Sequence, residues 1–422
     1  MFLDYINSNT FNSNKLKFKW IIMKEELILK SEESEQENRE YNYFQIDFLK
    51  TVMIFLVIYD HIVYWDIKRL IGVALWERIS IPVFLVIMGF NLGNSFRRSG
   101  AKTLRELYSR QYLKKKVLRY IIPFLVLYLV STITGWILYN FNIIEMYNTQ
   151  TYPTWGIINL FTGILPFWGP GNWFIPVILQ SILIAPLIYY GFTKKPKLTL
   201  ILTFIIEIAL QLIVFFFIGE ITSWEELHIL NLFMTSVLFY LSGIGLGFWF
   251  SQDHKLQSKH NFFMWILFPL SLAYLVGYQF FGFRIRIDGL PLLRGDYHFL
   301  VFPYSAFLVL LALRYLPKNP EGRLAKNIST IGKSTYHILL IQILALGMMV
   351  PFWGTHYAIS NGFNISEILD LLVPWALTIP VGVKWYKIDQ IKNLRERILY
   401  TAFLFVAYVA LIILLYSFAS SV

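Results

Sequence analysis

Residues 45–65 read QIDFLKTVMIFLVIYDHIVYW, and this stretch decides the class of fold. It is an apolar run of about 20 residues, the length that an α-helix needs to cross a hydrocarbon core about 30 Å thick. Similar runs recur from here to the C-terminus. A β-barrel would instead show alternating segments of about ten residues. The sequence therefore predicts an all-α, polytopic bundle of membrane-spanning helices.

The composition of the chain agrees with a membrane protein. Its 422 residues are 56% hydrophobic and 15% charged, whereas a soluble domain has roughly 25% charged residues. In a membrane protein the placement of cations matters more than their sum, so the net charge of +11 predicts no nucleic-acid partner. There is no cysteine, and no two of the seven histidines have ligand spacing on one helix face. We therefore expect no metal.

The apolar runs and the charges between them predict a topology. We expect about eleven spans (10 to 11), near residues 45–65, 71–95, 117–140, 172–192, 198–218, 228–250, 261–282, 298–316, 330–352, 366–384 and 398–419. Lysine and arginine concentrate in alternate connections, within residues 97–119, 194–197, 255–259, 318–326 and 387–397. By the positive-inside rule the N-terminus is cytoplasmic and the C-terminus external, in the plasma membrane. An even number of spans would break this alternation.

Residues 1–43 differ from the rest of the chain. They are polar and include the acidic run SEESEQENRE at 31–40, which is typical of disorder. We expect a disordered cytoplasmic segment over 1–43 and one multi-pass membrane domain over 44–422. Met23, followed by Lys24, Glu25 and Glu26, resembles an alternative translation start. In the external stretch 140–171, residues 155–168 are too short to span and are expected at the interface.

Charged groups inside a span are costly and therefore point to function. In the first span Asp47, Lys50 and His61 fall on one helical stripe, and Lys50 and His61 lie roughly 16 Å apart along the axis. A neutral imidazole near the outer end can take a proton from a hydroxyl. The alternative is an interfacial histidine without a catalytic role. Asp60 precedes His61 by about 100° of rotation, so we expect it to face elsewhere.

A basic residue, ten intervening residues and a histidine in the first span resemble the signature of the acyltransferase 3 family of membrane O-acyltransferases. Four further motifs follow in the order of that family, and the resemblance extends to about residue 345. They are Ile81-Pro82-Val83-Phe84 with Met88-Gly89-Phe90, the basic run ending Lys116-Val117-Leu118-Arg119-Tyr120-Ile121-Ile122-Pro123, Gly171-Asn172-Trp173-Phe174 with Pro186, and Ile331-Gly332-Lys333-Ser334-Thr335-Tyr336. Lys50 replaces the usual arginine, and Gln342 stands where a histidine is often found, so a two-histidine mechanism is not carried over.

The resemblance implies acetyl-coenzyme A, or another acyl-coenzyme A, as the cytoplasmic donor. It implies a hydroxyl of a glycan or lipid-linked glycan at the outer face as the acceptor. His61 and Lys50 are then the expected catalytic residues. Arg98 and Arg119 are the expected contacts of the coenzyme A phosphates, although such a basic run also serves orientation and anionic lipids.

Three residues are candidates for binding the acceptor. Trp173 lies in one of the resembling motifs, but packing is an equally ordinary role for it. Arg284 and Arg286 are unusual cations for an external loop and could bind an anionic glycan or lipid diphosphate. Salt bridges within the loop, to Asp288 and Asp296, are the alternative.

The main rival is a glycan or lipid transporter, a flippase without acyl transfer. Such a protein should show paired, broken helices in two related halves. The proline-interrupted spans here, at Pro82, Pro176 and Pro269, have no counterpart in a second half. A non-catalytic membrane partner is a third possibility. The sequence favours a membrane-bound O-acyltransferase, with acetyl as the expected group.

Overall fold

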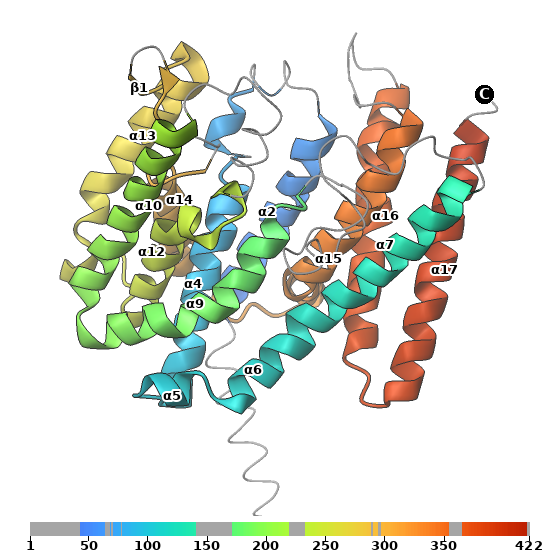
Figure 1. Cartoon of the computed structure of the whole chain (residues 1–422), viewed down its shortest axis with the longest axis horizontal. Helices are drawn as coiled ribbons and strands as arrows, with labels where there is room; N and C mark the ends of the chain where they lie inside the picture. The colour runs from blue at the N-terminus through green and yellow to red at the C-terminus, as the bar shows by residue number, and fades with distance from the viewer. Residues whose placement is uncertain are drawn as a thin grey trace, which may run out of the picture.

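The computed structural model describes residues 43–63, 68, 71–76, 78–140, 171–218, 233–287, 290–293, 297–353 and 365–419. These residues form a bundle of helices of which most run roughly side by side (Figure 1). The expectations for residues 1–42 and for the interfacial segment 155–168 lie outside the described part of the chain.

The longer helices are α2 (Phe44–Ile62), α4 (Ser80–Ser99), α7 (Ile122–Asn140), α9 (Phe174–Lys194), α10 (Pro196–Ile218), α12 (Leu241–Gln252), α13 (Met264–Phe281), α14 (Phe302–Tyr315), α15 (Arg323–Trp353), α16 (Ile365–Asp389) and α17 (Leu394–Ala419). The shorter ones are α5 (Leu104–Leu107), α6 (Arg110–Lys116), η1 (Val73–Leu75), η2 (Val117–Ile121), η3 (Val237–Tyr240) and η4 (Lys259–Asn261). Strands β1 (Arg286–Ile287) and β2 (Leu290–Pro291) pair antiparallel.

Each of the eleven expected segments overlaps one of the longer helices. Seven helical stretches of the described residues are long and apolar enough to cross a membrane. The stretches Val237–Gln252 and Phe302–Tyr315 are apolar but shorter, and α2 carries the charges of Asp47, Lys50 and Asp60. The structure therefore agrees with a helical membrane protein, while eleven spans stay a prediction.

Two details differ from the sequence-based expectations. The second helix begins at Ser80 rather than near residue 71, because Gly72 adopts a left-handed conformation (φ 68°) and the chain then forms the short η1. The connection between α13 and α14 holds the β1–β2 hairpin, whose strands are joined in the sequence by Asp288-Gly289, a pair that favours a tight hairpin turn.

Helices α4 and α12 approach closely because glycines line their crossing. A Cβ on Gly89 would lie 2.1 Å from the Ile244 carbonyl oxygen, and a Cβ on Gly247 would lie 2.0 Å from that of Val86. Gly93, one turn beyond Gly89, faces the side chain of Ser251. Small residues four apart let helices in a membrane pack backbone against backbone, which places α4 at the centre of the core.

The outer helices expose apolar side chains. Examples are Leu129 and Trp136 of α7, Phe217 of α10, Phe281 of α13 and Phe403 of α17, each at least half exposed. Exposed apolar surface on this scale is typical of a lipid-facing surface.

The basic connections share one side of the bundle. Helix α5, the α9–α10 turn and the α16–α17 turn lie at the lower face in Figure 1, whereas the end of α17 lies at the upper face. The charge alternation in the sequence thus corresponds to two faces of one fold.

Candidate functional site

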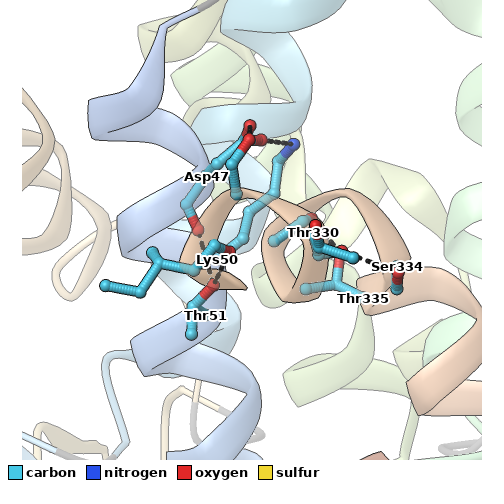
Figure 2. A network of polar contacts seen from close by, with 9 residues as sticks. Asp47, Lys50, Thr51, Thr330, Ser334 and Thr335 are labelled. Carbon is cyan, nitrogen blue, oxygen red and sulfur yellow. Dashed lines mark hydrogen bonds and ion pairs between the residues drawn. The ribbon is translucent and has the colours of Figure 1, made fainter. Parts of the chain in front are cut away.

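Helices α2 and α15 cross where the sequence places Asp47 and Gly332. A Cβ on Gly332 would lie 2.3 Å from the Asp47 carbonyl oxygen, so only glycine allows this approach. Thr51 Oγ1 donates to the Ile328 carbonyl oxygen at 2.8 Å, and Ser329 Oγ donates to Asp47 Oδ2 at 2.8 Å. Figure 2 shows Asp47, Lys50 and Thr51 on α2 beside the turn of α15 that carries Thr330 and Ser334.

Lys50 pairs with a carboxylate rather than standing alone. Its Nζ lies 3.4 Å from Asp47 Oδ1, and the two side chains are only 14% and 10% exposed. A paired charge is far less costly than an isolated one in a buried position. Arg119 lies close enough to both Asp47 and Lys50 for the charges to interact. The structure therefore brings two of the predicted site residues, Lys50 and Arg119, into one cluster.

Arg119 belongs to the π-helical turn η2, between α6 and α7. Pro123 has no N–H with which to bond the Arg119 carbonyl, and the ring of a proline crowds the carbonyl four residues before it. The chain widens instead, and the Ile122 N–H bonds to the Val117 carbonyl five residues back. Such π-turns often occur at functional sites.

The next residue in the turn, Tyr120, connects α7 to α15. The Tyr336 hydroxyl donates to the Tyr120 carbonyl oxygen at 2.9 Å, and their rings meet edge to face. Lys116 Nζ and Arg119 Cζ both lie within 6 Å of the Tyr120 ring centroid. The cation cluster of Lys50, Lys116 and Arg119 thus comes from α2, α6 and η2. Tyr336 of α15 packs against it through Tyr120.

His61 lies at the opposite end of α2. Its side chain is 22% exposed, and its Nδ1 is 3.9 Å from Asp60 Oδ2. Asp60 also pairs with Lys68 at 2.6 Å. The positions of Asp60 and His61 diverge by about 100° on the helix, yet their side-chain tips approach each other at its last turn.

The chain enters α9 beside His61. A Cβ on Gly171 would lie 3.8 Å from His61 Nε2 and 3.7 Å from Gln342 Nε2, and φ at this glycine is +90°. Two residues later, the half-buried Trp173 stacks on Tyr297 at 5.8 Å and lies 5.4 Å from Tyr240. The motif containing Gly171 and Trp173 thus adjoins the histidine end of α2.

The remaining predicted residues lie elsewhere on the surface. Arg98 is exposed at the end of α4 and donates to the Asn94 carbonyl oxygen. Arg284 is exposed and stacks over Tyr278 at 5.4 Å, and Arg286 is exposed on β1.

Sequence reasoning missed the buried His337. His337 Nε2 lies 3.0 Å from Asp389 Oδ2, and the ring packs on Trp385 and Tyr386. Its position directly after Tyr336 in the late motif was the available signal. Among the described residues no group of three or more His, Asp or Glu side chains is placed to hold a metal.

The model of the acyltransferase 3 family, described as an acyltransferase domain, matches residues 43–417. The chain therefore belongs to this family of acyltransferases. No curated protein and no solved structure matches it. The enzyme class is an acyltransferase with helices suited to a membrane, and the cation cluster and His61 lie at the two ends of its first helix.

Proposed function

We propose that this acyltransferase is an O-acetyltransferase of the plasma membrane. It moves the acyl group of cytoplasmic acetyl-coenzyme A to a hydroxyl of a cell-surface polysaccharide or its lipid-linked precursor. One observation carries the proposal: α2 bears the Lys50–Asp47 pair, with Arg119 beside it, at one end and His61 at the other. A donor with phosphates at one end and a thioester at the other suits such a spacing.

His61 acts as the general base. The acceptor hydroxyl gives its proton to the imidazole as its oxygen forms a bond to the acyl carbon. The carbon–sulfur bond then breaks, and the proton passes to the departing sulfur. The products are the glycan ester and free coenzyme A, so His61 returns to its starting state. The partial exposure of His61 supports access by an acceptor.

The cation cluster holds the donor. Arg119 is exposed and lies beside Lys50, and a guanidinium binds phosphate through two parallel hydrogen bonds. Arg98, on the same basic stretch of sequence, adds positive charge where the donor enters from the cytoplasm. Lys50 stays paired with Asp47. It keeps the cation cluster at the end of α2 from which the donor's thioester extends toward His61.

Trp173 and the hairpin arginines bind the acceptor. The Trp173 ring is stacked with Tyr297 next to the Gly171 end of the site, and aromatic faces combine an apolar surface with a polar edge. Arg284 and Arg286 are exposed cations that could attract an anionic glycan or a lipid diphosphate.

The test is His61→Ala, expressed in a strain lacking the gene. Envelope glycans are analysed by mass spectrometry, and acylation is normalised to membrane protein level. Acylation should fall by roughly 100-fold to 10,000-fold, the range of a lost general base. The control is His260→Ala, in the exposed turn before α13, which should keep activity. Activity of His61→Ala within a few-fold of wild type would refute the mechanism.

A further inference from the structure

Gln342, in the middle of α15, carries a carboxamide that has no hydrogen-bond partner among the described residues. The residue is fully buried, and neither Oε1 nor Nε2 has a hydrogen-bond partner in the described part of the chain. A buried amide without a partner costs about 1–3 kcal/mol. Buried polar groups in native proteins are nearly always bonded, so an unbonded pair of atoms on one side chain needs an explanation, and a bound ligand is one.

The Gln342 amide faces the same small space as the candidate base. A carbon atom placed as a Cβ on Gly171 would lie 3.7 Å from Gln342 Nε2, 3.8 Å from His61 Nε2 and 3.6 Å from Leu339. These are ordinary van der Waals distances, so both side-chain nitrogens border the position that a side chain of residue 171 would take. The positive φ of Gly171 favours glycine, so no side chain of residue 171 covers the two nitrogens.

Both sides of this space are fixed by the fold. Helices α2 and α15 are joined at the Asp47–Gly332 crossing, and both continue from it toward the His61 end. Whichever way the carboxamide is turned, it presents an N–H donor and an oxygen acceptor. It is neutral, so it suits an uncharged polar group rather than a carboxylate or a phosphate.

We propose that Gln342 binds the carbonyl of the donor's acyl group beside His61. This inference rests on the proposed function and concerns the same site. The carbonyl oxygen gains negative charge as the hydroxyl oxygen attacks the acyl carbon, and the Gln342 N–H donates to that oxygen. A donor already in place for a developing oxyanion lowers the barrier, because the site needs no rearrangement during the reaction. Gln342 itself exchanges no atom or proton.

A structural glutamine in this protein looks different. Gln180 of α9 donates from Nε2 to the Thr235 carbonyl oxygen at 3.1 Å and accepts at Oε1 from the Val237 N–H at 2.9 Å. Removing that amide breaks two hydrogen bonds to the backbone. Removing the Gln342 amide breaks none among the described residues, so the two glutamines should respond oppositely to the same substitution.

The test compares purified Gln342→Met, Gln180→Met and His61→Ala, with acetyl-coenzyme A as donor and envelope glycan from a strain lacking the gene as acceptor. Released coenzyme A is titrated as free thiol, and the chain adds no background because it has no cysteine. Gln342→Met should lower kcat roughly 100-fold to 1000-fold, the effect of losing one oxyanion donor, with little change in the KM for acetyl-coenzyme A. Its unfolding temperature should match or exceed that of wild type, whereas Gln180→Met should unfold earlier.

Gln342→His supplies a second variant, since it restores an N–H donor and should recover most of kcat. A kcat of Gln342→Met within a few-fold of wild type overturns the proposal. A fall in unfolding temperature as large as that of Gln180→Met, or a failure to fold, overturns it as well. If His61→Ala is inactive while Gln342→Met is active, only the role of Gln342 fails. If His61→Ala is active, the proposed function fails first.

Discussion

Gly332 of α15 lies against the backbone of Asp47 of α2, so close that a Cβ there would be 2.3 Å from the Asp47 carbonyl oxygen and 2.7 Å from its Cα. Any side chain at this position must push the two helices apart. Gly332→Ala should therefore destabilise the protein by about 1–3 kcal/mol, as overpacking does in other cores. Thermal unfolding in detergent and the monodisperse fraction in size exclusion measure this.

Gly277→Ala is the matched control for the Gly332 variant. The nearest atom to a Cβ on Gly277 would be Phe283 Cβ at 3.3 Å, a contact that is relieved by a shift of a few tenths of an ångström. Equal stability losses in the two variants would contradict a special closeness of α2 and α15.

Variants of the Lys50–Asp47 pair distinguish a role of the Lys50 charge in donor binding from a role in folding. Lys50→Arg keeps the charge and should keep most activity, whereas Lys50→Met leaves the Asp47 carboxylate buried without its partner and should reduce the amount of folded protein. Asp47→Asn combined with Lys50→Met removes both charges and should restore folding. Protein level and acyl transfer are measured for each variant.

Under the proposal, the double variant folds but transfers acyl groups poorly, because the donor has lost a cation from its cluster. If the double variant regains full activity, Lys50 serves only to neutralise Asp47.

Variants of Arg119 and Arg98 test the proposed binding site of the coenzyme A phosphates. Arg119→Gln should weaken coenzyme A binding by roughly 10-fold to 100-fold, corresponding to a lost charged hydrogen bond. Arg98→Gln should have a smaller effect, because Arg98 lies exposed at the end of α4. Both deficits should shrink as salt is raised, since screening weakens the wild-type contact as well. Isothermal titration at two salt concentrations measures this.

Lys194→Gln is the control for the phosphate-binding site. Lys194 also lies at the end of a helix on the basic face, but its Nζ lies over the Tyr190 ring. Unchanged affinity in a variant lacking both Arg98 and Arg119 would leave membrane orientation and lipid contact as the functions of the basic run.

The two faces of the bundle predict the orientation. A reporter that is active only outside the cytoplasm should be active when fused after Val422 and inactive when fused after Arg98, because basic connections stay inside. The opposite pattern would place His61 at the cytoplasmic side and exclude an external acceptor.

The sequence predicted some parts of the site because they lie on one helix. The spacing of Lys50 and His61 depends only on helix geometry, and α2 is one helix over both residues. The neighbourhood of His61 depends instead on how α9 and α15 pack. No pattern near Gly171 or Gln342 shows that these residues meet His61, since they are far apart in the chain.

Other structural features have a signal in the sequence that does not by itself identify them. Gly332 belongs to a motif, but the need for glycine there comes from its close approach to the Asp47 backbone, which a single sequence does not reveal. Pro123 signals the widened turn that positions Arg119, and Asp288-Gly289 signals the hairpin. The partner of His337 was unpredictable, because Asp389 comes from the end of a separate helix.

The segment between Lys50 and His61 contains neither glycine nor proline, and α2 runs through it without a break. A helix of this kind is stiff, so the distance between Lys50 and His61 stays the same when substrate binds. We expect the enzyme to select donors whose length matches that distance. Acyl thioesters with a shortened arm would reach the cations or the histidine, but not both, and should be poor substrates even when their acyl group is the preferred one.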